Sequence, residues 1–157
     1  MSNLSAFLIM ISISEGTARV PDLYRCCFMF RHTIVDMSDH PAITGEWKGE
    51  PLDFLGPDYK GLISTAAGKY QITKHTWEAC QGALNLPDFG PQSQDAAATL
   101  LIKQKGALDA VNGGRVADAI ALCHEVWASL PGSTSGQPQA SLASLVQAYT
   151  ANGGAFA

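Results

Sequence analysis

Apolar residues recur at helical spacing in several stretches of the chain. An almost wholly apolar run over 5–15 predicts a first helix, with Ser2, Asn3 or Ser5 as its N-cap and Gly16 as its stop. Four further stretches carry apolar stripes with the spacing of amphipathic helices: 73–84, 91–108, 116–129 and 138–152. The pattern therefore predicts a mainly helical protein.

The part of the chain that follows the first helix has a different pattern. Leu23–Phe30 and Thr33–Met37 are rich in strand-favouring residues, with Arg31–His32 as a turn between them. Gly and Pro punctuate 41–65, which predicts a long loop of the kind that often carries function. We therefore expect an α+β fold with a small antiparallel sheet, forming a single domain over 1–157.

Composition and charge narrow the functional classes. The 157 residues are 46% hydrophobic and carry 10 Lys+Arg against 14 Asp+Glu, for a net charge of −4. This length supports a packed core, and there is no basic cluster with which to neutralise nucleic-acid phosphates. The apolar run Ala6–Ile11 is far shorter than the roughly 20 residues of a membrane-spanning helix, and no basic residue precedes it as in a signal peptide. We expect neither nucleic-acid binding nor membrane insertion.

Standard catalytic and metal-binding motifs are absent from the sequence. The cysteines match no zinc or disulfide pattern, which favours reduced thiols. The histidines share no ligand spacing, and His124–Glu125 lacks the second histidine of a zinc-protease motif. Thr134 rather than serine occupies the centre of Gly132–Gly136, which argues against a nucleophile elbow. We therefore expect no metal and no cofactor.

Glu15 is the carboxylate with the most informative position. It ends an apolar helix, where the negative end of the helix dipole and the apolar neighbours both disfavour ionisation. Both effects raise the pKa of the carboxyl towards the range of a general acid. The alternative is an ordinary solvated glutamate at a helix end, which on position alone is the more frequent case.

Six short motifs occur in a fixed order with characteristic gaps. They are Ile13–Thr17, Ser38–Pro41, Ser64–Gln71, Ser93–Ala96, Ile102–Leu108 and Trp127–Gly132. Each is weak alone, but together they closely resemble the lambda-type endolysins, a family of lysozyme-like lytic transglycosylases. The resemblance extends over nearly the whole chain.

The resemblance implies a fold and an activity. The fold would be lysozyme-like and mainly helical, with the small antiparallel β-sheet flanking a substrate cleft. The activity would be cleavage of the β-1,4 bond between N-acetylmuramic acid and N-acetylglucosamine in bacterial peptidoglycan, with formation of a 1,6-anhydromuramic end, causing lysis of the host cell. The catalytic glutamate of the family's Ser-Glu-Gly-Thr motif falls on Glu15. One carboxylate suffices for this reaction, because it can protonate the glycosidic oxygen and then accept the proton of the sugar's own C6 hydroxyl.

Two alternatives remain open. A hydrolytic lysozyme would add water and need a second carboxylate about 5 to 9.5 Å from the first. Asp36 and Asp39 are the candidates, although we expect binding or structural roles for them. A catalytically silent peptidoglycan-binding or tail module is the third possibility, and the retention of Glu15 in its motif argues against it, since a binder needs no proton donor.

Further residues are candidates for substrate binding. They are Asp36, Asp39, His40, Trp47, Ser64, Thr65, Lys69, Tyr70, Gln71, Ser135 and Gln137. We expect 64–71 to line the cleft, with Tyr70 as either a stacking face or a core residue and Gln71 as either a sugar-binding amide or a support for the Glu15 loop. Trp47 would meet a ligand if its loop closes over the cleft, whereas Trp127 lies on an apolar stripe and is expected in the core. The Ser133–Gln137 loop would form the opposite rim.

The resemblance also implies partners and location. The partner would be the glycan strands of peptidoglycan, and the enzyme would be a monomer. It would accumulate in the host cytoplasm until a separate holin, which it does not bind, opens the membrane, and would then act in the periplasm on the cell wall.

Overall fold

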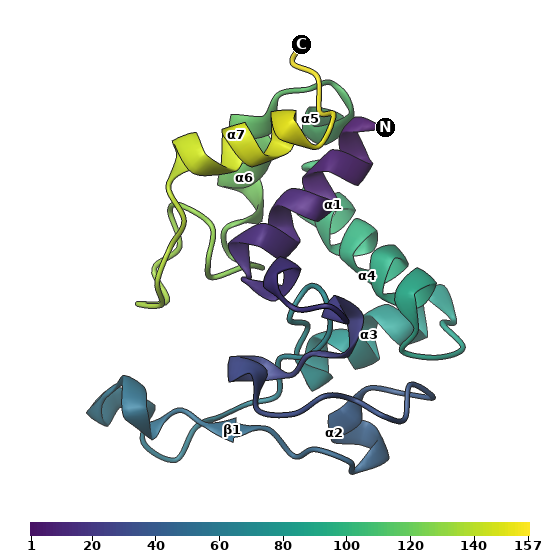
Figure 1. The fold of residues 1–157 in the computed structure, drawn as a ribbon, viewed down its shortest axis with the longest axis vertical. Helices are drawn as coiled ribbons and strands as arrows, with labels where there is room; N and C mark the ends of the chain where they lie inside the picture. The colour runs from purple at the N-terminus through teal and green to yellow at the C-terminus, as the bar shows by residue number, and fades with distance from the viewer. The chain divides into compact units, whose positions relative to one another are not determined.

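The computed structural model describes residues 1–157, and their contacts divide the chain into two units. The first unit combines Met1–Arg19 with Ala98–Ala157, and the second comprises Val20–Ala97. None of the helices combines the length and the apolar character that crossing a membrane requires. The α-helices and strands are α1 (Asn3–Ser14), α2 (Pro41–Thr44), β1 (Glu50–Pro51), β2 (Ile63–Ser64), α3 (Lys74–Leu84), α4 (Pro91–Gln104), α5 (Leu108–Asn112), α6 (Val116–Cys123) and α7 (Leu142–Ala151) (Figure 1).

The first unit is built around α1, which contacts α5 and α7. The Ser2 side chain caps α1 by accepting the N–H of Ser5, as predicted for one of the three candidate caps. Phe7 and Ile11 are fully buried because α1 is apolar around nearly its whole circumference. Burial of each such side chain stabilises the fold by about 1.5–3 kcal/mol. This packing fixes the helix whose last turn leads to Glu15.

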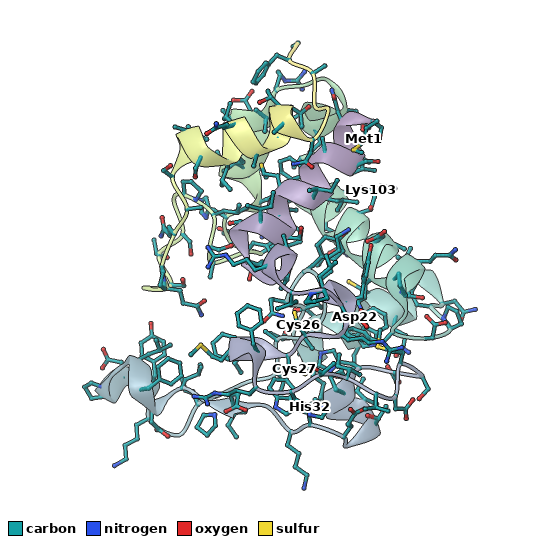
Figure 2. All side chains as sticks on the ribbon, in the orientation of Figure 1. Met1, Asp22, Cys26, Cys27, His32 and Lys103 are labelled. Atoms are coloured by element: carbon teal, nitrogen blue, oxygen red, sulfur yellow. The ribbon has the colours of Figure 1, made fainter.

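An aromatic cluster forms the core of the second unit. Trp77 of α3 meets Phe89 edge to face, with ring centroids 4.7 Å apart, and the His40 ring meets the same phenyl ring at 4.9 Å. All three side chains are fully buried. Cys26 and Cys27 are also buried, as free thiols, and burial raises the pKa of Cys26 to about 11 (Figure 2). Thiols with such pKa values are weak nucleophiles, which is consistent with core residues.

The sheet forms in a different place from the one predicted. The expectation of strands at Leu23–Phe30 and Thr33–Met37 was wrong. Leu23–Phe30 contains two short 3₁₀ turns, Thr33–Met37 contains no helix or strand, and only isolated bridges join Cys26 to Thr33 and Cys27 to Ala67. Met29 and Phe30 adopt φ of 59° and 55°, a left-handed conformation that interrupts any strand. The two-stranded antiparallel sheet instead pairs β1 with β2, inside the segment predicted to be a loop.

Three helices are shorter than their apolar stripes predicted. α4 ends at Gln104, because Gly106 (φ 68°) turns the chain before Leu108 begins α5. α6 ends at Cys123, where the N–H groups of Val126 and Trp127 both reach the Cys123 carbonyl in tight turns. α7 begins only after its N-cap Ser141, since the residues before it form a loop. Past the ends of α4 and α6, Ala107 and Trp127 are buried without helical backbone.

Candidate active site

Glu15 is held at the C-terminal end of α1 by the sequence around it. Glu15 is the C-cap residue, and Gly16 follows with φ 78°, a left-handed conformation that glycine adopts without steric cost. The Thr17 hydroxyl donates to the Ser12 carbonyl at 3.1 Å, which satisfies one of the unpaired carbonyls of the last turn. The Ser-Glu-Gly-Thr motif is therefore a helix-ending signal that presents a carboxylate.

Ser129 is the direct partner of Glu15. Its hydroxyl donates to Glu15 Oε1 at 2.5 Å, and Ser14 Oγ donates to Ser129 Oγ at 2.7 Å. Ser129 also forms a backbone hydrogen bond with the Glu15 carboxyl. The flanking Trp127 and Leu130 are buried and anchor the turn that carries Ser129. Ser129 is not among the site residues predicted from the sequence, although it lies inside the motif Trp127–Gly132.

The environment of Glu15 prepares it for proton transfer. The side chain is partly buried, and desolvation raises the pKa of Glu15 from 4.5 to about 7, even though the hydrogen bonds from Ser129 act in the opposite direction. The α1 C-terminus also disfavours the charged form. A carboxyl with a pKa near neutrality is protonated often enough to act as an acid and is basic enough to take a proton back.

Asp36 hydrogen-bonds within its own loop, and Asp39 joins its loop to α3. Asp36 is exposed and accepts the Ser38 N–H at 2.9 Å, and hydrogen bonding to the side chain and the backbone of Ser38 lowers the pKa of its carboxyl. Asp39 Oδ1 accepts the Trp77 indole N–H at 2.8 Å and the Gln81 amide at 3.3 Å. Both carboxylates thus have structural partners.

His40 and Tyr70 are fully buried. His40 Nε2 donates to the Ile72 carbonyl at 2.9 Å, while Nδ1 accepts the Ala42 N–H, and burial lowers the pKa of the ring. The Tyr70 hydroxyl donates to Asp95 Oδ1 at 2.5 Å. In this structure the two rings brace the second unit, and neither presents a surface on which a sugar ring could stack.

The remaining residues of the 64–71 segment are held by hydrogen bonds within the second unit. Ser64 Oγ accepts the Ala66 N–H, and Thr65 Oγ1 accepts the Lys74 N–H at the start of α3. Lys69 Nζ donates to the Tyr24 hydroxyl and lies 3.5 Å from an Asp95 carboxylate oxygen. The Gln71 amide donates to the Gly68 and Cys26 carbonyls, and Gln71 itself adopts φ 50°. Of these four, Ser64, Thr65 and Gln71 remain partly exposed, whereas Lys69 is buried.

Trp47, Ser135 and Gln137 occupy loops. Trp47 is only 8% exposed, and its indole N–H points to Glu50 Oε1 at 3.4 Å, so it is packed rather than presented to a ligand. Ser135 Oγ contacts Ser133 Oγ and accepts the Gln137 N–H. This loop is closed at its base by the Ala140 N–H, which donates to the Ser129 carbonyl. The base of this loop is therefore tied to the residue that binds Glu15.

No group of three His, Cys, Asp or Glu side chains is placed so that it could hold a metal ion.

A mainly helical α+β fold with a glutamate of raised pKa at the end of its first helix is typical of lysozyme-like proteins. The family model described as Endolysin matches residues 5–156. The endolysin of Escherichia phage P2 is 39% identical over 97% of this chain and 93% of its own length. The endolysin of Escherichia phage lambda is 37% identical over 95% of this chain and 90% of its own length. The chain therefore belongs to the endolysin family.

Solved structures agree with this assignment. Bacteriophage lambda lysozyme in complex with a chitohexasaccharide matches with a TM-score of 0.86 at 36% identity, covering 100% of this chain and 98% of that chain. Another structure of lysozyme from bacteriophage lambda matches with a TM-score of 0.82 at 34% identity and the same coverage. The predicted lysozyme-like α+β fold is thereby confirmed.

Proposed function

We propose that this endolysin is a peptidoglycan lytic transglycosylase in which Glu15 is the catalytic acid and base. The observation that carries the proposal is the hydrogen-bonded, partly buried Glu15 carboxyl, whose pKa of about 7 suits it to both roles. The substrate is the β-1,4 bond between N-acetylmuramic acid and N-acetylglucosamine. The whole chain acts as one catalytic domain.

In the first half of the reaction, protonated Glu15 gives its proton to the glycosidic oxygen as the bond to the muramoyl C1 breaks and positive charge develops on the sugar. In the second half, the C6 hydroxyl of the same sugar bonds to C1 and transfers its proton to Glu15. The carboxyl is thereby restored, and no water is consumed. Ser129 holds the carboxylate between the two steps, since its hydroxyl donates to the ionised oxygen at 2.5 Å.

The exposure and the hydrogen-bond partners of the other acidic residues support a mechanism with one carboxylate. In the unit that contains Glu15, the remaining ones are Asp109, Asp118 and Glu125, all exposed. Glu125 is already paired with Lys105 at 2.6 Å. Asp36 accepts the Ser38 N–H and Asp39 accepts the Trp77 indole N–H, so each has a structural partner, whereas a hydrolytic lysozyme requires a second carboxylate that activates a water.

Substrate contacts are assigned according to exposure. The partly exposed Ser64, Thr65 and Gln71 and the partly exposed loop residues Ser135 and Gln137 are proposed to contact glycan. The buried candidates are proposed to position these loops instead: His40, Trp47, Lys69 and Tyr70. Membership of the endolysin family further supports release to the cell wall through a holin that acts upstream.

Mass spectrometry of the fragments released from purified Gram-negative peptidoglycan tests the proposal. The wild type should release anhydromuropeptides, one water lighter than hydrolysed products, whereas Glu15→Gln should release almost none. Glu125→Gln is the matched control, because it makes the same chemical change at an exposed residue and should keep full activity. Hydrated products would instead identify a hydrolytic lysozyme, and binding to sacculi without any release would identify a silent binding module.

A further inference from the structure

A pocket of about 320 Å³ lies within the first unit, beside the end of α1. Its walls include Ser14 and Arg19 on one side and Gln139 and Ser144 on the other, from the loop before α7 and the first turn of that helix. Ser14 connects the pocket to the proposed catalytic group, since its hydroxyl donates to Ser129, which in turn donates to Glu15. The pocket is large enough for part of a ligand that also reaches Glu15.

Arg19 carries the only charge in the lining of this pocket, whereas the hydroxyls of Ser14 and Ser144 already donate to Ser129 and to the Ser141 carbonyl. The Arg19 side chain is exposed, and its guanidinium has no ion-pair or hydrogen-bond partner in the chain. The Gln139 amide uses one of its two N–H groups on the Ser133 carbonyl, which leaves the second available. No acidic residue lines the pocket. An arginine fork without a partner, on a wall that lacks carboxylates, is suited to a carboxylate ligand.

We propose that this pocket binds a carboxylate of the peptide stem that peptidoglycan carries on the lactyl group of muramic acid. The inference rests on the proposed function, because it takes the muramoyl residue to be at Glu15. A bound muramoyl sugar must project its lactyl substituent away from the scissile bond. The wall of the pocket includes Ser14, which directly precedes Glu15 in the chain. Arg19 thus gives the enzyme a contact with stem-bearing wall that a chitin-type oligosaccharide, which lacks a lactyl group, does not provide.

Arg19→Gln tests the proposal on two substrates: soluble peptide-bearing glycan strands and the same strands after amidase has removed the stems. The variant should lose about tenfold in kcat/KM on the peptide-bearing strands, the loss expected for one charge-assisted contact, and stay within about twofold of the wild type on stripped strands. Lys103→Gln is the control for the change in net charge, because Lys103 lies on α4 (Figure 2), is exposed and does not line the pocket. It should leave both rates unchanged.

An equal effect of Arg19→Gln on both substrates, or no effect on either, would overturn the proposal. Isothermal titration calorimetry, with the soluble disaccharide tetrapeptide added to the wild type and to Arg19→Gln, measures binding of the stem independently of turnover. If the wild type turned over neither substrate, the proposed function would fail, whereas the titration would still show whether Arg19 contributes to binding of the stem. Arg19→Lys should recover part of the affinity, because it restores the charge but not the bidentate geometry.

Discussion

Replacing Glu15 with Gln should stabilise the protein in a way that depends on pH. The pKa of Glu15 is about 7 in the folded protein against 4.5 for an ordinary glutamate. Between these values the unfolded chain releases the proton while the folded chain retains it, so the stability of the wild type falls as pH rises towards 7. Gln cannot ionise and still offers an oxygen to the Ser129 hydroxyl. The stability advantage of the variant should therefore grow by about 2–3 kcal/mol between about pH 5 and about pH 8.

Urea unfolding followed by tryptophan fluorescence at the two pH values measures this difference. Glu125→Gln is the control, since the Lys105 hydrogen bond lowers the pKa of Glu125. That ion pair stabilises the fold above the ordinary pKa of glutamate and is lost at lower pH, so its removal should produce no gain at high pH. If the advantage of Glu15→Gln were the same at both values, Glu15 would have an ordinary pKa, and the catalytic argument based on its burial would be refuted.

Three other substitutions test the remaining contacts. Ser129→Ala removes a donor that favours ionised Glu15, so the pKa of Glu15 should rise further, and the limb of the pH–rate profile that reports Glu15 should move to higher pH. Gly68→Ala should lower the free energy of unfolding by about 2 kcal/mol or more in urea titrations, because the residue has φ 77° and a Cβ there would clash with Gln94 Oε1. Asp39→Ala leaves the Trp77 indole N–H and the Gln81 amide without their acceptor and should lower the free energy of unfolding by about 2 kcal/mol. KM for peptidoglycan should stay within about twofold of the wild type, about the error of such assays. A large rise in KM without loss of stability would instead make Asp39 a substrate ligand.

The predictions of secondary structure were correct where a helix or a strand depends on residues close to it in sequence. The run over 5–15, closed by Gly16, matches α1 within two residues at its start and one at its end, because an apolar helix and its glycine stop depend on neighbours in sequence. The strands expected at 23–37 failed for the opposite reason. Cys26 and Cys27 find their bridge partners in Thr33 and Ala67, and the second of these lies 40 residues away. Tertiary contacts of this kind override strand propensity.

Local chemistry around Glu15 was readable from the sequence, and its final environment was not. A glutamate that ends an apolar helix before a glycine can be recognised in the sequence alone, and so can the motifs of the endolysin family. The hydrogen bond from Ser129, 114 residues further along the chain, to that carboxyl depends on the folded structure, and so does the packing of Trp47 in place of its exposure. Helix propensity and capping act over a few residues, whereas desolvation and hydrogen bonding between distant residues exist only once the chain has folded, and these set the pKa of Glu15.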